Sequence, residues 1–204
     1  MWLICPQTLS RYGYRLDDIP LIYGDLPDEF RSQLTLIYRD KVNPPKKVFT
    51  ELSQLRHQIP HAEKCLVTYG FAAWVNELQL AGLHLPDQSH IQSVRSQLRS
   101  QATLGVSRHA VTLSGHEGKD GADYIFMSPV FTPTSKSIDE TPLGLSRFKQ
   151  LLQKSDTQVF ALGGINSSNL STIKTSGAFG AVFLGSIFQS ANPQQLLQET
   201  CASW

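Results

Sequence analysis

The sequence has almost no excess charge of either sign, because 18 Lys and Arg residues stand against 17 Asp and Glu residues for a net charge of +1. This balance argues against binding to nucleic acid or to a charged membrane surface. No apolar run approaches the ~20 residues of a membrane span. The first residues, MWLICPQT, also lack the basic segment and long apolar stretch of a signal peptide. We therefore expect a cytoplasmic protein with no membrane partner.

Cysteine is scarce, and a dinucleotide-binding glycine motif is absent. The three cysteines, Cys5, Cys65 and Cys201, show neither CxxC nor metal-ligand spacing, so we expect no disulfide framework and no structural metal. The first apolar run is followed by CPQTLS rather than GxGxxG. The sequence therefore does not favour a Rossmann fold.

The apolar residues fall into eight short runs, most of them separated by segments with helical spacing. Within 204 residues this pattern predicts an α/β protein, a single (βα)8 TIM barrel over residues 1–204, rather than a doubly wound sheet. The predicted strands are 2–5, 34–38, 65–68, 82–85, 103–107, 123–127, 158–162 and 180–184. The clearest predicted helices are 46–58, 71–80, 88–100 and 144–153, and a short or irregular helix is expected within 16–30.

Two small-residue turns follow the last two predicted strands. Gly163 and Gly164 come after the seventh, and Gly185 and Ser186 after the eighth. Glycine lets the backbone approach a ligand closely, and the start of the following helix carries partial positive charge. In a TIM barrel these two turns often bind phosphate. The sequence predicts such a site here, although a tight strand-to-helix connection would also require glycine.

Other polar residues stand at predicted strand ends. Arg39 and Lys41 follow the second strand and could face an anionic substrate, or they could belong to a solvated loop. The loop 128–136 carries Thr134, Ser135 and Lys136, which could bind phosphate oxygens or form an exposed Pro-rich lid.

Two histidines are candidates for the barrel mouth. Along 82–85, Leu83 and Leu85 share one face and leave His84 on the other, where it could approach the mouth or serve as a satisfied structural residue. His109 follows the fifth strand. An imidazole there is suited to acid-base chemistry near neutral pH, while the alternative is a structural residue in the loop.

Several segments together resemble the thiamine phosphate synthase/TenI family, and the resemblance spans nearly the whole chain in order. They are RDK at 39–41, GLHL at 82–85, GVSRH at 105–109, GADYIFMSPVFTPTSK at 121–136, ALGGI at 161–165 and GAFGAVFLGSI at 177–187. The resemblance implies a thiamine-biosynthesis barrel with one of two activities. Synthases join an aminopyrimidine diphosphate to a thiazole phosphate with Mg²⁺ and release pyrophosphate. TenI proteins tautomerise a thiazole carboxylate phosphate and need no metal.

The sequence departs from the synthase pattern where the resemblance would require substrate and metal ligands. Ile37 stands where synthases have a glutamine, and Thr68-Tyr69 stands where they have Asn-Asp with a metal-binding aspartate. Residues 86–89, PDQS, replace a Gln-Glu-Asp type motif, although Asp87 could shift into register. Arg39, Lys41, Ser107, Ser135 and Lys136 still match. Tyr38 and Tyr69 would narrow a pyrimidine pocket.

His109, two residues beyond Ser107, matches the acid-base histidine that the resemblance implies for TenI proteins. Our expectation is therefore a thiazole tautomerase with His109 as catalytic residue, a phosphorylated thiazole as ligand and no cofactor. The alternative is a thiamine phosphate synthase with an altered Mg²⁺ site, and a second is a non-catalytic protein that binds thiazole phosphate or thiamine phosphate. The resemblance also implies a homodimer.

Overall fold

The computed structural model describes residues 1–87, 89–109, 121–132 and 141–204. Three predicted pocket residues, Thr134, Ser135 and Lys136, lie outside the described residues. No helix in the described ranges is both long and apolar enough to cross a bilayer.

Eight strands form one parallel sheet in chain order, from β1 to β8. The sheet closes on itself, because Trp2 and Phe183 form a parallel bridge and the N–H of Leu3 donates to Phe183 O at 2.8 Å. The predicted TIM barrel is therefore confirmed. The strands are β1 (Trp2–Ile4), β2 (Leu36–Tyr38), β3 (Leu66–Tyr69), β4 (Gly82–Leu85), β5 (Thr103–His109), β6 (Tyr124–Ser128), β7 (Gln158–Leu162) and β8 (Gly180–Val182).

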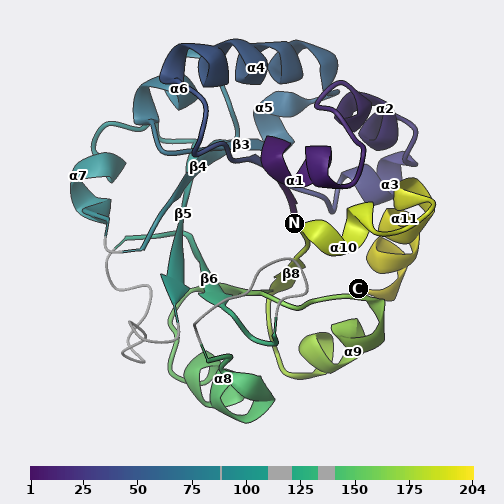
Figure 1. Ribbon diagram of the computed structural model, residues 1–204. Coiled ribbons are helices and arrows are strands. Elements are labelled where there is room, and N and C mark those ends of the chain that lie inside the picture. Colours follow the sequence, from purple (N-terminus) through teal and green to yellow (C-terminus); the bar gives the residue numbers. More distant parts are fainter. Residues whose placement is uncertain (88, 110–120, 133–140) are drawn as a thin grey trace.

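Helices surround the barrel as an outer ring, while α1 and α10, which follow the neighbouring strands β1 and β8, lie closer to the barrel axis (Figure 1). The helices are α1 (Pro6–Arg11), α2 (Asp18–Gly24), α3 (Asp28–Arg31), α4 (Pro45–Gln58), α5 (Ala62–Cys65), α6 (Ala72–Glu77), α7 (Ile91–Arg95), α8 (Gly144–Leu152), α9 (Ser167–Thr175), α10 (Gly185–Phe188) and α11 (Pro193–Ser203).

Several predicted element boundaries were wrong. Cys65 ends α5 instead of opening a strand, and the helix predicted over 71–80 is limited to α6. Phe71, the first residue of that predicted helix, has extended backbone angles and is 50% exposed. The helix predicted over 88–100 shrinks to α7, whereas β5 extends two residues further than predicted, to His109. The extent of short helices depends on tertiary packing, which the hydrophobic periodicity of the sequence does not show.

The apolar core has two parts, because strand side chains alternate between the barrel interior and the helices. One cluster fills the interior and contains Leu3, Ile37, Val67, Tyr124, Phe126, Phe160 and Val182. The larger cluster lies between the strands and the helix ring. Tyr38 belongs to this outer layer, where its hydroxyl donates to Glu51 of α4. It therefore does not narrow the barrel mouth.

The Gly163-Gly164 turn is held tightly against the segment that follows β6. The N–H of Val130 donates to Leu162 O at 2.9 Å, and the N–H of Phe131 donates to Gly163 O at 3.0 Å. Gly163 has φ +97°, and a Cβ there would lie 2.7 Å from Pro129 Cβ. The turn therefore requires glycine for backbone conformation and for space.

We expect Gly163→Ala to destabilise the fold more than Gly177→Ala, which is its matched control. Gly177 has nearly the same φ, +91°, but a Cβ there would meet nothing within 4 Å. Both variants carry left-handed strain of about 1–2 kcal/mol, and overpacking adds about 1–3 kcal/mol to the first. Urea denaturation measures both. Equal losses would show that the contact with Pro129 can relax freely.

Candidate active site

A cavity of about 260 Å³ lies at the carboxyl ends of the barrel strands. All the predicted site residues that the structure describes line it: Arg39, Lys41, His84, Ser107, His109, Gly163, Gly164, Gly185 and Ser186. These residues come from widely separated parts of the sequence and meet because parallel strands end on the same side. The volume is slightly below the ~300 Å³ at which ligand pockets usually begin. The cavity is therefore suited to a small ligand.

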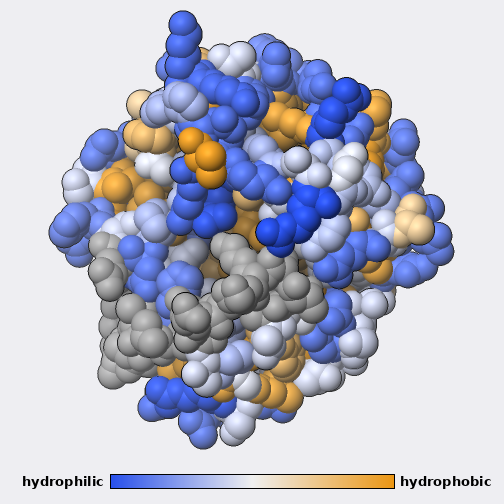
Figure 2. All heavy atoms as spheres, in the orientation of Figure 1, coloured by the Kyte–Doolittle hydropathy of each residue, from blue (hydrophilic) through white to orange (hydrophobic). Residues whose placement is uncertain are grey.

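Positive charge gathers around Tyr69 at the mouth. The Arg39 guanidinium carbon lies 5.3 Å from the centre of the Tyr69 ring, and Lys41 Nζ lies 5.0 Å from it. Both distances are within the range of cation–π attraction. The Tyr69 ring therefore holds two cations beside the cavity without contributing an opposite charge. Both cations can then attract an anionic ligand. Hydrophilic residues predominate on the face of the molecule that Figure 2 shows.

His84 is buried and satisfied, and it also lines the cavity. It is 2% exposed, and its Nε2 lies 2.9 Å from Ser107 Oγ while its Nδ1 lies 3.2 Å from Tyr124 Oη. Its ring stacks on Phe126 at 4.1 Å between centres. Burial, assisted by the nearby charge of Arg39, lowers the pKa of His84 to about 3. The imidazole is therefore neutral at pH 7.

His109 occupies the last position of β5 and lines the cavity together with Ser107, two residues earlier on the same strand face. Its backbone N–H donates to Asp87 Oδ2 at 3.3 Å, and its Nδ1 lies 3.5 Å from Ser128 Oγ on β6. Asp87 in turn accepts a hydrogen bond from Arg108 at 3.2 Å. These contacts fix the end of β5, so the imidazole is held at the cavity wall.

The two small-residue turns border the same cavity. Gly185 and Ser186 are the first residues of α10, and the first N–H groups of a helix have no partner inside that helix. Before α9, the Asn166 side chain accepts from the N–H of Ser168 at 2.9 Å, and Asn169 Oδ1 accepts from the N–H of Asn166 at 3.0 Å. Since these asparagines already cap α9, the α10 turn is the better donor for an anion.

The described residues do not fit a Mg²⁺ site. A cation bridging a diphosphate takes charged oxygen ligands, and Asp87 is the one carboxylate among the described residues lining the cavity. It is already engaged by Arg108 and by the His109 N–H. Tyr69 holds another position where the resemblance called for a metal carboxylate. No group of three or more His, Cys, Asp or Glu side chains that could hold a metal occurs in the described ranges.

Some lining residues carry no role in the sequence-based prediction, among them Phe126, Ser128 and Asn166. Strict alternation along DYIFMS could have placed Tyr124, Phe126 and Ser128 on one inward face. Asn166 had no such signal. In the sequence Asn166 could not be distinguished from an ordinary helix cap, because only the structure shows its position beside the cavity.

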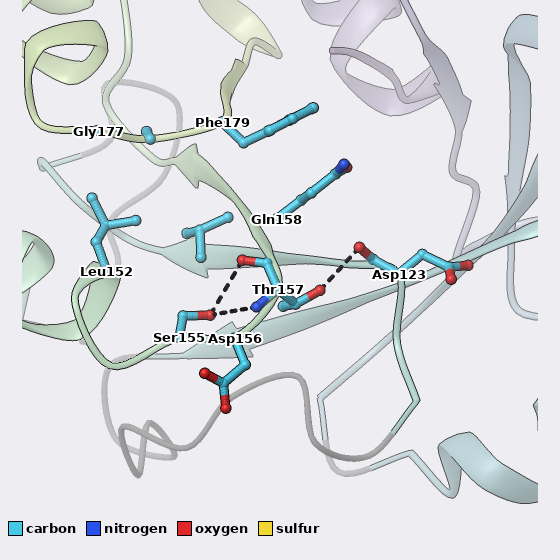
Figure 3. A pocket seen from close by; sticks show the side chains of 10 residues that line it. Asp123, Leu152, Ser155, Asp156, Thr157, Gln158, Gly177 and Phe179 are labelled. Atoms are coloured by element: carbon cyan, nitrogen blue, oxygen red, sulfur yellow. Dashed lines mark hydrogen bonds between the residues drawn. The ribbon is translucent and has the colours of Figure 1, made fainter.

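A second hollow, of about 790 Å³, lies at the opposite end of the barrel, among the segments that precede β6, β7 and β8 (Figure 3). It is larger than the cavity but open to solvent. The Thr157 hydroxyl donates to Asp123 O at 3.0 Å, and the Asp123 carboxylate is held by Arg95 and by the N–H of Leu104. Polar groups at this end of a TIM barrel serve stability rather than catalysis.

Fold and cavity define a TIM-barrel protein whose cations and glycine turns surround a small pocket at the carboxyl ends of the strands. The family model described as thiamine monophosphate synthase (TMP-TENI) matches residues 32–187. The chain belongs to this family. The TenI-like branch remains a prediction.

Individual relatives agree with the family. The chain is 35% identical over 99 residues to "Putative thiamine-phosphate synthase 2" of Aquifex aeolicus, covering 48% of this chain and 53% of that protein. It is 35% identical over 114 residues to "Thiamine-phosphate synthase" of Prochlorococcus marinus, covering 55% of this chain and 32% of that protein. The matches thus span about half and a third of these relatives. The structure of thiamine phosphate pyrophosphorylase from Pyrococcus furiosus has a TM-score of 0.78 at 17% identity, over 99% of this chain and 93% of that one, and shows the same fold.

We expect His84 to make the protein acid-sensitive. The pKa of His84 is about 3 in the folded protein, against an ordinary value of 6.5, so between these values the unfolded chain binds the extra proton. The contribution of His84 to the free energy of unfolding is complete above about pH 6.5. It is lost as the pH falls toward 3, by up to about 1.4 kcal/mol per pH unit.

Urea denaturation at about pH 7.5 and about pH 4.5 measures this loss. We expect His84→Gln to lose about 2–3 kcal/mol less than wild type between these two conditions. His57→Gln, on the exposed side of α4, is the control and should behave as wild type. An identical pH dependence in all three proteins would contradict a neutral buried His84.

Proposed function

We propose that the protein is a TenI-like thiazole tautomerase that moves a proton on a phosphorylated thiazole. The observation that carries this proposal is that His109 lines the same small cavity as the two small-residue turns and the cations Arg39 and Lys41. An anchored anion and one imidazole suffice for a proton shift. The cavity volume of about 260 Å³ supports a single small substrate.

In the proposed reaction the phosphate binds the N–H groups at Gly185 and Ser186 beside Gly163 and Gly164, which puts the thiazole ring toward β5. The imidazole of His109 accepts a proton at one position of the substrate and returns it at another, so no group is transferred and no proton is consumed. Acid-base catalysis by one positioned side chain contributes about 10²–10⁴-fold. Arg39 and Lys41 attract the anionic substrate to the mouth.

Thiamine phosphate synthesis is the second candidate, and the names of the relatives favour it. That reaction needs a site for an aminopyrimidine diphosphate and its Mg²⁺. Asp87 is the one carboxylate available among the described lining residues, and it is engaged by Arg108. The donor set therefore supports a reaction without metal better than it supports the synthase.

His109→Asn tests the proposal. With EDTA present, we expect wild-type protein to exchange the transferred proton of a thiazole carboxylate phosphate with deuterium from solvent, followed by NMR. The variant should lose about 10²-fold or more of this rate, while its affinity for the substrate changes little. His57→Asn, on the exposed side of α4, is the matched control and should keep the wild-type rate.

The alternatives give different results. Pyrophosphate release from the aminopyrimidine diphosphate, dependent on Mg²⁺ and abolished by EDTA, would replace the tautomerase with the synthase. Binding of thiazole phosphate without turnover, equal in wild type and His109→Asn, would mean that the protein is a binding or regulatory barrel.

A further inference from the structure

Three side chains from neighbouring strands form a hydrogen-bonded row that leads from the closed barrel interior to the cavity. Tyr124 of β6 bonds to His84 of β4, and His84 bonds to Ser107 of β5. Tyr124 is 3% exposed and lies deep in the interior, whereas Ser107 lines the cavity. The row therefore connects a buried phenol with a hydroxyl that a ligand can reach.

The absence of a side chain at Gly105 makes this row possible. In the sheet, Gly105 of β5 pairs with His84 on one side and with Tyr124 on the other. A Cβ at Gly105 would lie 2.0–2.5 Å from atoms of the Tyr124 ring, including its hydroxyl. The phenol therefore crosses β5 over this glycine to reach His84. Phe126, stacked on His84 at 4.1 Å, holds the imidazole from another side.

The chemistry of the three groups determines the direction of the row, that is, which group donates in each of its two hydrogen bonds. A phenol has one proton to donate, and His84 Nδ1 is the acceptor that the described residues offer it, at 3.2 Å. A buried hydroxyl proton without an acceptor is costly, so Tyr124 donates to Nδ1. A neutral imidazole then carries its single proton on Nε2, and this N–H donates to Ser107 Oγ at 2.9 Å. The proton of Ser107 itself is left to point elsewhere.

We propose that Tyr124 and His84 are positioning residues that hold the Ser107 hydroxyl as a hydrogen-bond donor into the cavity, toward an acceptor oxygen or nitrogen of the bound substrate. The identity of that substrate rests on the proposed function, whereas the direction of the row does not. Ser107 stands two residues before His109 on the same strand face, so the donated hydrogen bond orients the ligand beside the imidazole.

The state of His84 in the free protein tests the direction of the row. Nitrogen-15 NMR of histidine-labelled protein at about pH 7 distinguishes the two neutral tautomers, and His84→Gln assigns the signal. We expect the Nε2–H tautomer in wild type and a mixture of tautomers in Tyr124→Phe. Tyr38→Phe removes a buried phenol hydroxyl outside the barrel interior and should leave the signal unchanged. A wild-type ring protonated on Nδ1 would overturn the proposal.

A double-mutant cycle tests the action through Ser107, with thiazole phosphate as the titrated ligand. Ser107→Ala and Tyr124→Phe should each weaken binding about 3- to 10-fold, the worth of one neutral hydrogen bond. In the Ser107→Ala background, Tyr124→Phe should cause no further loss. Additive losses would mean that Tyr124 acts only on the fold and would overturn the positioning role. Failure of wild type to bind thiazole phosphate would contradict the proposed function instead, and the tautomer would still decide the direction of the row.

Discussion

Eight parallel strands close around one interior, and this closure positions both the core and the cavity. Each strand contributes every second side chain to that interior. The deeper positions are filled by apolar and aromatic residues such as Phe126 and Phe160, and the positions toward the carboxyl ends carry Ser107 and His109. One alternation therefore builds both the core and the cavity. A chemical group at an inward-facing position near the end of any strand is therefore directed at a common ligand.

The electrostatics of the cavity follow from which groups are buried and which are open. His84 is buried beside Arg39, and its lowered pKa keeps it neutral. The cationic groups of Arg39 and Lys41 lie against the face of Tyr69, 5.3 Å and 5.0 Å from the ring centre. Asp87 is balanced by Arg108 at 3.2 Å. Among the residues that the structure describes, the charge left to meet a ligand is therefore positive, and the buried imidazole acts through hydrogen bonds rather than through charge.

Most strands and the turns at their ends could be predicted from the sequence. A buried strand such as 158–162 is recognisable from its apolar composition, and the turn Gly163-Gly164 follows it directly. All nine predicted site residues within the described ranges line one cavity. Tertiary distances were beyond prediction. The engagement of Asp87 by Arg108 depends on a contact 21 positions apart in sequence, and the passage of Tyr124 over Gly105 depends on sheet register. The sequence did not determine which face of its strand Tyr38 occupies, because an offset of one position turns a strand residue from the interior to the outside.

The proposed function requires that this barrel bind one phosphorylated thiazole and need no metal. Isothermal titration calorimetry checks both requirements, first with thiazole phosphate in EDTA and then with the aminopyrimidine diphosphate in Mg²⁺. We expect heat and saturable binding in the first titration and none in the second. Binding of the diphosphate that depends on Mg²⁺, with thiazole phosphate binding alongside it, would rule out the tautomerase and restore thiamine phosphate synthesis as the function.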